Sequence, residues 1–480
     1  MKPNEPPPAA AARERMLAAI EAAPEIVGVP ATPFEQRSAP ANSDEALALA
    51  FADEHTNRLR YVAQWGWLVF DGTKWIRDET LHAFDKARET ARRAAQECNK
   101  PKTAKDLASA KTVAAIERLA KADRRIATAA DVWDVDPLLL NTPGGIVDFR
   151  AGKMRAHDPK ALMTKSTSVA PSGDCPKFLK FLAEITRNDE PMIEYLRRVF
   201  GYALTGLTTE HALFFGYGTG ANGKSVLLST FAGLLGDYHK TAPIETFVNS
   251  ANDRHPTDLA GLRGARLVTA IETEEGRRWA ESKIKALTGG DRISARFMRQ
   301  DFFEFTPAFK LFIAGNHKPG LRSVDESIRR RFHLIPFDVT IAAEDRDPRL
   351  AEKLRDEWPG ILAWAIDGCD RWKASGLSRP ERVTAATSDY LEAEDSIAAW
   401  IAERCIDSPS EFETGATLFK SWSAWATAAG EYVGSQKRLA QALETKGYHS
   451  IRTMKARGFK GLRVVVEVPQ HHSEVEGGLE

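Results

Sequence analysis

The sequence predicts a multidomain protein with an α/β fold at its centre. The chain has 480 residues, well beyond the length at which one hydrophobic core stops growing, so roughly two to four structural units are expected. Between Ala212 and about Val339, strand-like apolar runs alternate with helical segments, which is the pattern of a parallel sheet covered by helices. A glycine-rich stretch follows the first run and precedes a helix.

Composition and charge exclude several classes of protein. Hydrophobic residues make up 43% of the chain and no apolar run approaches the length of a membrane span. The first residues lack the apolar segment of a secretory signal, so we expect a cytoplasmic protein. The four cysteines form no CxxC pair, which argues against a zinc ribbon or a disulfide framework. Lys plus Arg and Asp plus Glu are equal at 66 each, so only local charge can indicate a polyanionic partner.

The N-terminal third is expected to be mostly helical. Residues 1–42 are rich in Pro, Ala and Ser and predict a disordered leader. Residues 43–130 predict helices and one hairpin at Asp71-Gly72, between aromatic runs. The basic helices from Leu81 to Ile126 are interpreted as a solvated face in preference to a binding site. Residues 131–210 begin with short strands and continue as two helices that break at Arg187 to Asp189, a helical collar domain.

Further boundaries follow from changes in pattern. We expect the α/β core at 211–345 and a helical lid at 346–393. A small mixed unit follows at 394–470, and 471–480 is expected to be a disordered tail.

The glycine-rich stretch fits the phosphate-binding loop G-x-x-x-x-G-K-[ST] in the strand, loop and helix context that this motif requires. Its residues are Gly218, Thr219, Gly220, Ala221, Asn222, Gly223, Lys224 and Ser225. Glycines let backbone N–H groups turn toward phosphate oxygens, and the helix N-terminus adds positive potential. Lys224 can reach the terminal phosphates and Ser225 can bind Mg²⁺.

Polar residues after the next strands supply what hydrolysis needs. Glu272 and Glu274 follow one strand and Asn316 follows another, at the sheet edge where open α/β folds bind ligands. Arg330 and Arg331 precede the last strand, and arginine suits contact with a phosphate transition state. These residues are therefore the candidate catalytic groups, together with Lys224.

The order and spacing of these motifs resemble superfamily 3 helicases, specifically the helicase portion of phage and plasmid primase-helicases. The blocks that carry the resemblance are FLKFLAEITRNDEPMIEYLRRVFGYALTG, GTGANGKS, KIKALTGGDRISARF and the arginine pair before IPF. The resemblance implies an AAA+ core and a hexameric ring with ATP and Mg²⁺ between neighbouring subunits. It also implies single-stranded DNA in the central channel.

The same resemblance assigns individual roles. Ser225 and Glu272 would hold Mg²⁺, with the division of labour between Glu272 and Glu274 left open. Arg331 best fits the finger supplied to the neighbour's ATP, with Arg330 close behind. The candidate DNA contacts of the core are Lys285, Arg296 and Arg299, the last two on a hairpin that family members point into the channel.

The segment from Gly415 to Arg463 holds nine Lys/Arg against two acids. Its two helices and a hairpin near Ala456-Arg457-Gly458 match a winged helix, which would bind duplex DNA through Lys437 and Arg438 on the second helix.

The sequence thus predicts an ATP-dependent DNA helicase that acts in phage, prophage or plasmid replication, inside a bacterial or phage-infected cell. A bifunctional primase-helicase is one alternative, although only about 130 residues precede the shared region and no zinc ribbon is present. A non-unwinding, ATP-dependent origin-binding protein is the other.

Overall fold

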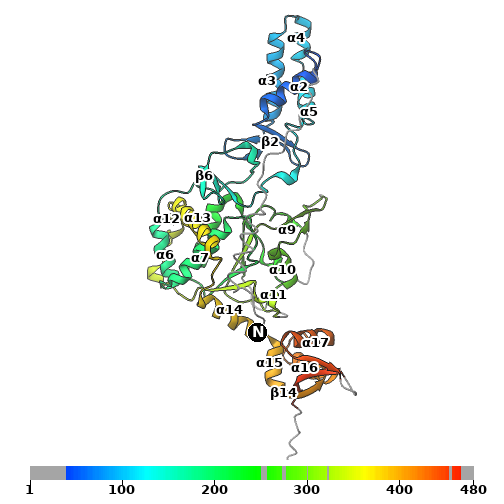
Figure 1. The fold of residues 1–480 in the computed structure, drawn as a ribbon. Coiled ribbons are helices and arrows are strands. Elements are labelled where there is room, and N and C mark those ends of the chain that lie inside the picture. Colours follow the sequence, from blue (N-terminus) through cyan, green and yellow to red (C-terminus); the bar gives the residue numbers. More distant parts are fainter. Residues whose placement is uncertain are drawn as a thin grey trace, which may run out of the picture.

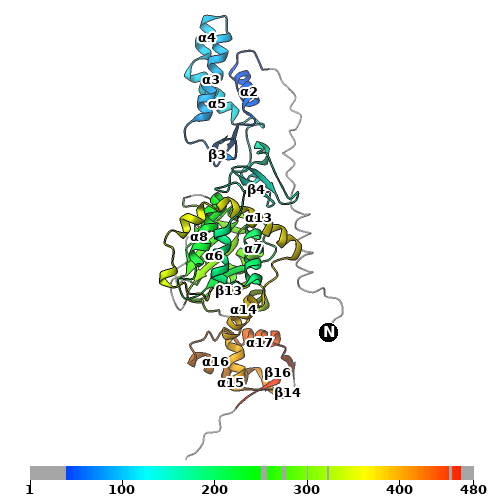
Figure 2. The ribbon, with the colours of Figure 1, turned by 90° about the vertical axis from the view of Figure 1, so that its left-hand side faces the viewer.

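The computed structural model describes residues 39–249, 257–272, 277–299, 301–321, 324–452 and 457–465. Most of the expected leader and the whole expected tail lie outside these ranges. Figures 1 and 2 show an elongated chain with an N-terminal helical unit at one end, an α/β body in the middle and a small C-terminal unit at the other end.

The N-terminal unit combines four helices with a small antiparallel sheet of order β1-β2-β3. The predicted hairpin at Asp71-Gly72 is confirmed, since β2 pairs with β3 through Phe70 and Trp75. The Asp71 carboxylate accepts the backbone N–H of Lys74 at 2.8 Å, which closes the turn. The elements are α2 (Asp44–His55), β1 (Leu59–Val62), β2 (Gly66–Phe70), β3 (Trp75–Arg77), α3 (His82–Glu97), α4 (Pro101–Leu107) and α5 (Ala110–Ala120).

Residues 131–210 form a second antiparallel sheet and two helices. The predicted break is confirmed, because Arg187 and Asn188 have left-handed φ values of 59° and 56°. Asp189 then caps the next helix by accepting the Met192 N–H at 3.1 Å. The elements are β4 (Leu139–Thr142), β5 (Gly145–Asp148), β6 (Lys153–Arg155), α6 (Pro176–Thr186) and α7 (Glu190–Ala203).

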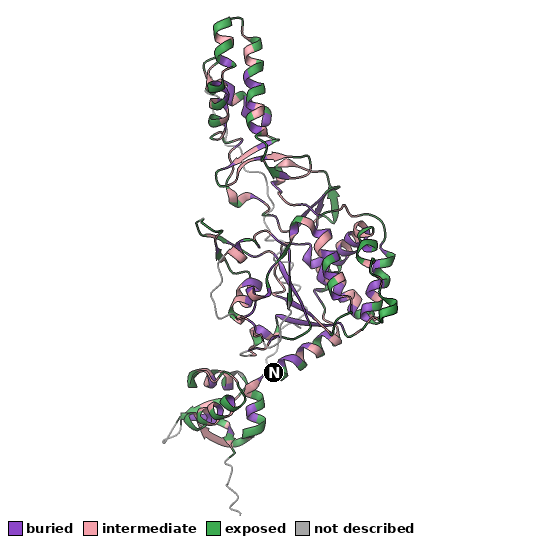
Figure 3. Cartoon of the chain, turned by 180° about the vertical axis from the view of Figure 1, so that it is seen from behind, coloured by how far each residue is buried: buried purple, intermediate pink, exposed green. Residues whose placement is uncertain are grey.

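The body contains the predicted parallel sheet, in the order β13-β7-β12-β9-β8. Alternate strand residues face opposite layers: Phe214 and Phe312 belong to one core with α6, α7, α8 and α13, and Phe215 and Ile313 belong to the other. Figure 3 shows the strands buried between these layers. The strands are β7 (Leu213–Tyr217), β8 (His239–Thr241), β9 (Leu267–Glu272), β12 (Lys310–Gly315) and β13 (Phe332–Pro336).

The helices and the hairpin of the body are α8 (Lys224–Leu235), α9 (Thr257–Ala260), α10 (Glu281–Gly289), β10 (Ile293–Ala295), β11 (Phe303–Phe305), α11 (Glu326–Arg329), α12 (Leu350–Arg355), α13 (Trp358–Ser375) and α14 (Glu381–Ala393). Short 3-10 helices span Ala130–Val132, Pro159–Ala161, Gly236–Tyr238, Ile244–Thr246 and Ala343–Asp345. Among the described residues, no helix is both long and apolar enough to cross a membrane.

The C-terminal unit has a three-stranded antiparallel sheet, β14-β16-β15, packed against its helices. The predicted second helix begins as expected, with Ser435 accepting the Arg438 N–H at 3.3 Å. The predicted hairpin joins β15 to β16, which pair at Arg452 and Arg457, while Ala456 lies outside the described residues. The elements are α15 (Ser396–Arg404), β14 (Cys405–Thr414), α16 (Gly415–Ala428), α17 (Gln436–Thr445), β15 (His449–Arg452) and β16 (Arg457–Val464).

Two buried cations join residues 131–210 to the sheet. The Arg266 guanidinium, just before β9, donates to the carbonyls of Leu204 and Leu139, both at 2.5 Å. The Lys310 ammonium, at the start of β12, donates to the carbonyls of Thr205 and Leu207. Most of these carbonyls follow the end of α7, where the helix dipole favours positive charge. Burial and the neighbouring Arg266 charge lower the pKa of Lys310 well below its usual value.

We predict that Lys310→Ala lowers the free energy of unfolding by about 2 to 3 kcal/mol, because the buried carbonyls lose a charged donor. Lys180 lies exposed on α6, and Lys180→Ala should change stability by no more than about 0.5 kcal/mol. Denaturant unfolding followed by circular dichroism measures both variants. Equal stability of the two would show that Lys310 does not hold this junction.

Candidate nucleotide site

The phosphate loop lies between β7 and α8, and its glycines are required by close packing. A Cβ on Gly218 would lie 2.0 Å from the Phe337 carbonyl oxygen. Gly223 has φ +81°, and a Cβ there would lie 2.4 Å from Cγ2 of Ile185 in α6. The backbone therefore approaches its neighbours more closely than any side chain would permit, and α6 packs directly on the loop.

Lys224 opens α8 and is almost completely buried, with 6% of its surface exposed. Its Nζ donates to the Gly218 carbonyl at 2.6 Å and lies 3.5 Å from Oδ1 of Asn316. Burial lowers the pKa of Lys224. The predicted phosphate-binding lysine thus points across its own loop, toward the residue predicted to sense the γ-phosphate.

The carboxyl ends of three neighbouring strands meet beside this lysine. In the sheet register, Gly315 of β12 pairs with Tyr217 of β7 and with Glu272 of β9. Asn316 follows Gly315 directly and is exposed at this edge. The backbone therefore brings Glu272 and Asn316 to neighbouring strand ends, as expected, whereas Glu274 lies outside the described residues.

A strap after β13 holds the loop from its other side. The Asn222 side chain donates to the Phe337 carbonyl at 2.9 Å, and the Ile341 N–H donates to the Ala221 carbonyl at 2.9 Å. Sequence reasoning did not identify this strap. The strap runs from Phe337 to Ile341, directly after the last strand of the sheet. Its sequence shows that a loop begins there, but does not reveal that this loop contacts the phosphate loop.

The chemistry of the site fits a nucleotide with Mg²⁺. Ser225 is exposed beside Lys224, at the N-terminus of α8. Mg²⁺ is usually held by one or two protein groups together with substrate phosphates, so a serine and a carboxylate at the strand edge are an adequate set. Thr219, Gly220 and Ala221 are exposed, so this part of the loop is open to solvent.

The two candidate finger arginines lie in different environments. Arg331 is buried, and its guanidinium donates to Thr288 Oγ1 at 3.1 Å and to the Ser327 carbonyl at 2.8 Å. Burial, followed by the charge of Arg330, lowers the pKa of Arg331. Arg330 is exposed, and no ion pair involves it within the described ranges. Of the two, Arg330 is thus the one available to a neighbouring molecule.

The predicted DNA contacts of the body also differ in availability. Lys285 pairs with Asp325 at 2.6 Å, which ties α10 to the N-cap of α11. Hairpin β10–β11 forms as expected. Arg296 stacks over the Phe302 ring at 4.6 Å, whereas Arg299 is exposed at the tip with φ +61°. Arg299 is therefore the best exposed of the three, and Lys285 already has an acidic partner.

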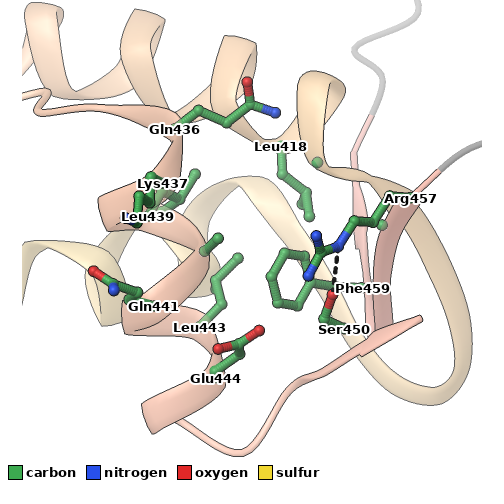
Figure 4. Close-up of a pocket in the computed structure, with 13 residues that line it drawn as sticks. Leu418, Gln436, Lys437, Leu439, Gln441, Leu443, Glu444, Ser450, Arg457 and Phe459 are labelled. Carbon is green, nitrogen blue, oxygen red and sulfur yellow. Dashed lines mark hydrogen bonds between the residues drawn. The ribbon is translucent and has the colours of Figure 1, made fainter. Parts of the chain in front are cut away.

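In the C-terminal unit, a groove of about 500 Å³ separates α17 from the β15–β16 hairpin (Figure 4). Lys437 is exposed and lines this groove, and Arg457 donates to Ser450 Oγ at 3.3 Å on the opposite wall. Arg438 stacks over the Tyr432 ring at 5.1 Å. Apolar walls from Leu418, Leu443 and Phe459 close the bottom of the groove.

Comparison with known proteins gives two family matches. Residues 48–187 match a family described as D5 N terminal like, and residues 216–331 match a family of unknown function (DUF5906). The second match includes the phosphate loop, Asn316 and the arginine run.

Two viral proteins are similar to a larger part of the chain than either family model is. It is 28% identical over 282 residues to "Putative helicase L207/L206" of Acanthamoeba polyphaga mimivirus, covering 54% of this chain and 29% of that protein. It is 25% identical over 304 residues to "Putative helicase 022R" of Frog virus 3 (isolate Goorha), covering 58% and 30%. The chain resembles viral helicase proteins. The resemblance predicted from the motifs is confirmed, although this helicase-like chain spans only about 30% of the length of these relatives.

Among solved structures, the apo structure of the NrS-1 C terminal region (305-718) overlaps 62% of the helicase-like chain and 78% of its own chain. Its sequence identity is 10% and the TM-score is 0.41. At that score, the overlap supports no conclusion about this chain.

We predict that Arg331→Ala lowers the free energy of unfolding by about 2 kcal/mol, since the buried Thr288 hydroxyl and the half-buried Ser327 carbonyl lose a charged donor. Arg330→Ala removes the same side chain one residue earlier, at an exposed position, and should change stability by less than about 0.5 kcal/mol. Thermal and denaturant unfolding distinguish the two. A stable Arg331→Ala variant would mean that this arginine is not held within its own chain.

Proposed function

We propose that the chain is an ATP-dependent DNA helicase of superfamily 3. The observation that carries the proposal is the approach of Lys224 Nζ to Asn316 Oδ1, at 3.5 Å, across the carboxyl edge of a parallel sheet. A phosphate loop by itself is compatible with many nucleotide-binding proteins. A polar residue from a separate strand beside its lysine is placed to contact the γ-phosphate or orient the attacking water, as cleavage of that phosphate needs.

The proposed steps use side chains of this edge. Lys224 exchanges its contact with the Gly218 carbonyl for the terminal phosphates, and the loop N–H groups hold the remaining oxygens. Asn316 contacts the γ-phosphate and the attacking water. Glu272 or Glu274 orients and activates that water. Bound Mg²⁺, held by Ser225 and Glu272, would neutralise charge that develops on the phosphate oxygens.

Hydrolysis is proposed to be shared between subunits of a hexameric ring. Arg330 is exposed and has no acidic partner in the described part of the chain, so it is available to contact ATP bound by a neighbour. Arg331 is the second candidate and would need to leave its contacts with Thr288 and Ser327 to take this role. An arginine supplied in this way stabilises the transition state and couples each site to the next.

DNA contacts are proposed at two places. Arg299, with Arg296 behind it, would touch the backbone of a single strand in the central channel, where sequence-independent contacts allow movement. Lys437 and Arg438 on α17 would bind duplex DNA, in a unit whose element order matches a winged helix. Lys285 would contribute by holding α10 against the start of α11, through its ion pair with Asp325.

We further propose AAA+ organisation for residues 211–345, with 131–210 as a collar, 346–393 as a lid and 394–470 as the winged-helix domain. Replication of phage, prophage or plasmid DNA in the cytoplasm of the host is the proposed setting. The main alternative is a primase-helicase, which is favoured by the match of residues 48–187 to the D5 N terminal like family. Templated primer synthesis by the purified chain would support that alternative.

The helicase proposal predicts ATP hydrolysis that increases with single-stranded DNA, and separation of a forked duplex. Lys224→Ala should lower both rates by about 100-fold or more, because phosphate binding in the transition state is lost. Lys240, exposed on β8, provides the control variant Lys240→Ala, which should retain both activities. ATPase activity without strand separation, over a range of salt concentrations, would favour the origin-binding alternative.

If Arg330 acts on ATP bound by the neighbouring subunit, two inactive variants should restore activity when they are mixed. Arg330→Ala should bind ATP normally but lose turnover by about 1000-fold, since it removes only the neighbour's contribution. Mixing Arg330→Ala with Lys224→Ala subunits should restore part of the activity, because some interfaces then combine an intact Lys224 with an intact Arg330. Steady-state ATPase assays across mixing ratios measure this effect. No recovery at any ratio, with normal assembly by light scattering, would contradict a finger role for Arg330.

A further inference from the structure

Three helices of the N-terminal unit carry a local excess of positive charge. From His82 to Arg125, which includes α3, α4 and α5, there are twelve Lys and Arg residues but six Asp and Glu. The chain as a whole is balanced. This part of the protein has no role in the function proposed above.

Ion pairs neutralise five of these cations. The closest pairs join Lys86 to Glu89, Arg88 to Asp85, Lys121 to Glu117, Arg125 to Asp123 and Arg93 to Glu54. These contacts occupy four of the six acids of the segment. The remaining acids are Glu97 and Asp106.

The other seven cations are all exposed, and none makes an ion pair with any residue that the structure describes. They define what we call the N-terminal basic surface: Arg92, Lys100, Lys102, Lys105, Lys111, Arg118 and Arg124. Three of them surround or belong to α4, the short helix between α3 and α5. The excess charge is therefore accessible and is not used to hold the fold together.

The position of this surface makes it available to a large partner. Figures 1 and 2 show α3, α4 and α5 projecting from the body at the end farthest from the C-terminal unit. Figure 3 shows that the outward sides of these helices are exposed. The helices pack on one another through apolar residues such as Ala87, Ala91 and Ile116, which leaves the long cationic side chains on the outside.

The chemistry of the surface fits phosphates better than protein. Protein interfaces are depleted of lysine and enriched in aromatic residues, yet four of these seven side chains are lysines. Single-stranded nucleic acid is usually held by aromatic stacking as well as charge. On α3, α4 and α5, Phe84 is the exposed aromatic, and it lies at the end of α3 away from α4.

The dimensions also suit a duplex. Lys111 and Arg118 lie seven residues apart on α5, which separates them by about 10 Å along the helix axis. Over that length, duplex DNA presents about six backbone charges. Cations at this spacing can therefore meet more than one phosphate.

The sequence pattern of these helices favoured a solvated face over a binding site. From the exposed, unpaired cations we propose instead that the N-terminal basic surface binds the sugar-phosphate backbone of duplex DNA without reading its sequence. This inference goes beyond the proposed helicase function, because it needs neither ATP hydrolysis nor the C-terminal unit. Contacts of this kind position a protein on DNA but carry no sequence information. With the proposed winged helix at the opposite end, the protomer would contact duplex DNA at both extremities.

The test compares two triple variants of the full chain that remove the same charge from the same unit. The test variant, Lys102→Gln, Lys105→Gln and Lys111→Gln, removes unpaired cations of the basic surface. The control variant, Lys86→Gln, Arg88→Gln and Lys121→Gln, removes cations that are held in ion pairs. Both are measured by fluorescence anisotropy on a labelled random-sequence duplex over a series of salt concentrations, after melting curves confirm that they fold.

For the test variant, the slope of log Kobs against log salt should become shallower by about 2 to 3, because each lost phosphate contact removes about 0.9. Its affinity at moderate salt should fall about tenfold or more. The control should keep the slope of the unmodified chain. The same difference between variants should persist when Lys437→Gln and Arg438→Gln are added to each.

Equal slopes for the test and control variants would overturn the proposal. So would a loss confined to single-stranded DNA, or competition by polyglutamate as effective as competition by duplex, which would indicate an acidic protein partner. Basal ATP hydrolysis without DNA should be the same in both variants and the unmodified chain. Absence of hydrolysis in all three would count against the helicase function and leave the duplex-binding result unaffected.

Discussion

The arrangement of the body depends on two buried cations at the amino ends of neighbouring strands. Arg266 and Lys310 satisfy the carbonyls after α7, and both side chains are removed from water. A buried charge is costly unless it is paired or hydrogen bonded. Moving α7 relative to the sheet would break these hydrogen bonds, so the contacts fix the position of α7. The tyrosine rings of Tyr202 and Tyr238 lie 4.5 Å from the two cations and add favourable cation–π contact.

The two strands that begin at these cations, β9 and β12, also lead to the candidate site. Arg266 and Lys310 stand at the amino ends of β9 and β12, whereas Glu272 and Asn316 stand at or just beyond their carboxyl ends. With the amino ends of both strands fixed to α7, their carboxyl ends lie at one sheet edge, where Asn316 approaches the lysine of the phosphate loop. The helix before α7 contributes as well, because α6 packs against Gly223. Residues 131–210 therefore support the predicted phosphate loop directly.

A carboxylate at the opposite side of the body links the basic C-terminal unit to the arginine run. Asp395 caps α15, lies 3.7 Å from Arg329 and also bonds to Lys446. The adjacent Glu394 accepts the Leu321 N–H at 2.7 Å, in the loop that follows Asn316, and burial raises the pKa of this carboxyl. A displacement of the C-terminal unit would therefore act on segments next to Asn316 and Arg330, which would give the proposed DNA and nucleotide sites a physical route for coupling.

The sequence by itself determined the parallel sheet, the phosphate loop, the helix break at Arg187 and the start of α17 at Ser435, because these depend on local periodicity, glycine and capping residues. It also placed Glu272 and Asn316 at one edge, since parallel strands end together. Only the tertiary structure decided that Arg331 is buried while Arg330 is exposed, and that Lys285 belongs to Asp325. It alone revealed the strap over the loop and the Arg266 and Lys310 junction. In each of these cases the partner comes from a segment distant in the chain, and residue type and spacing carry no information about which distant groups will meet.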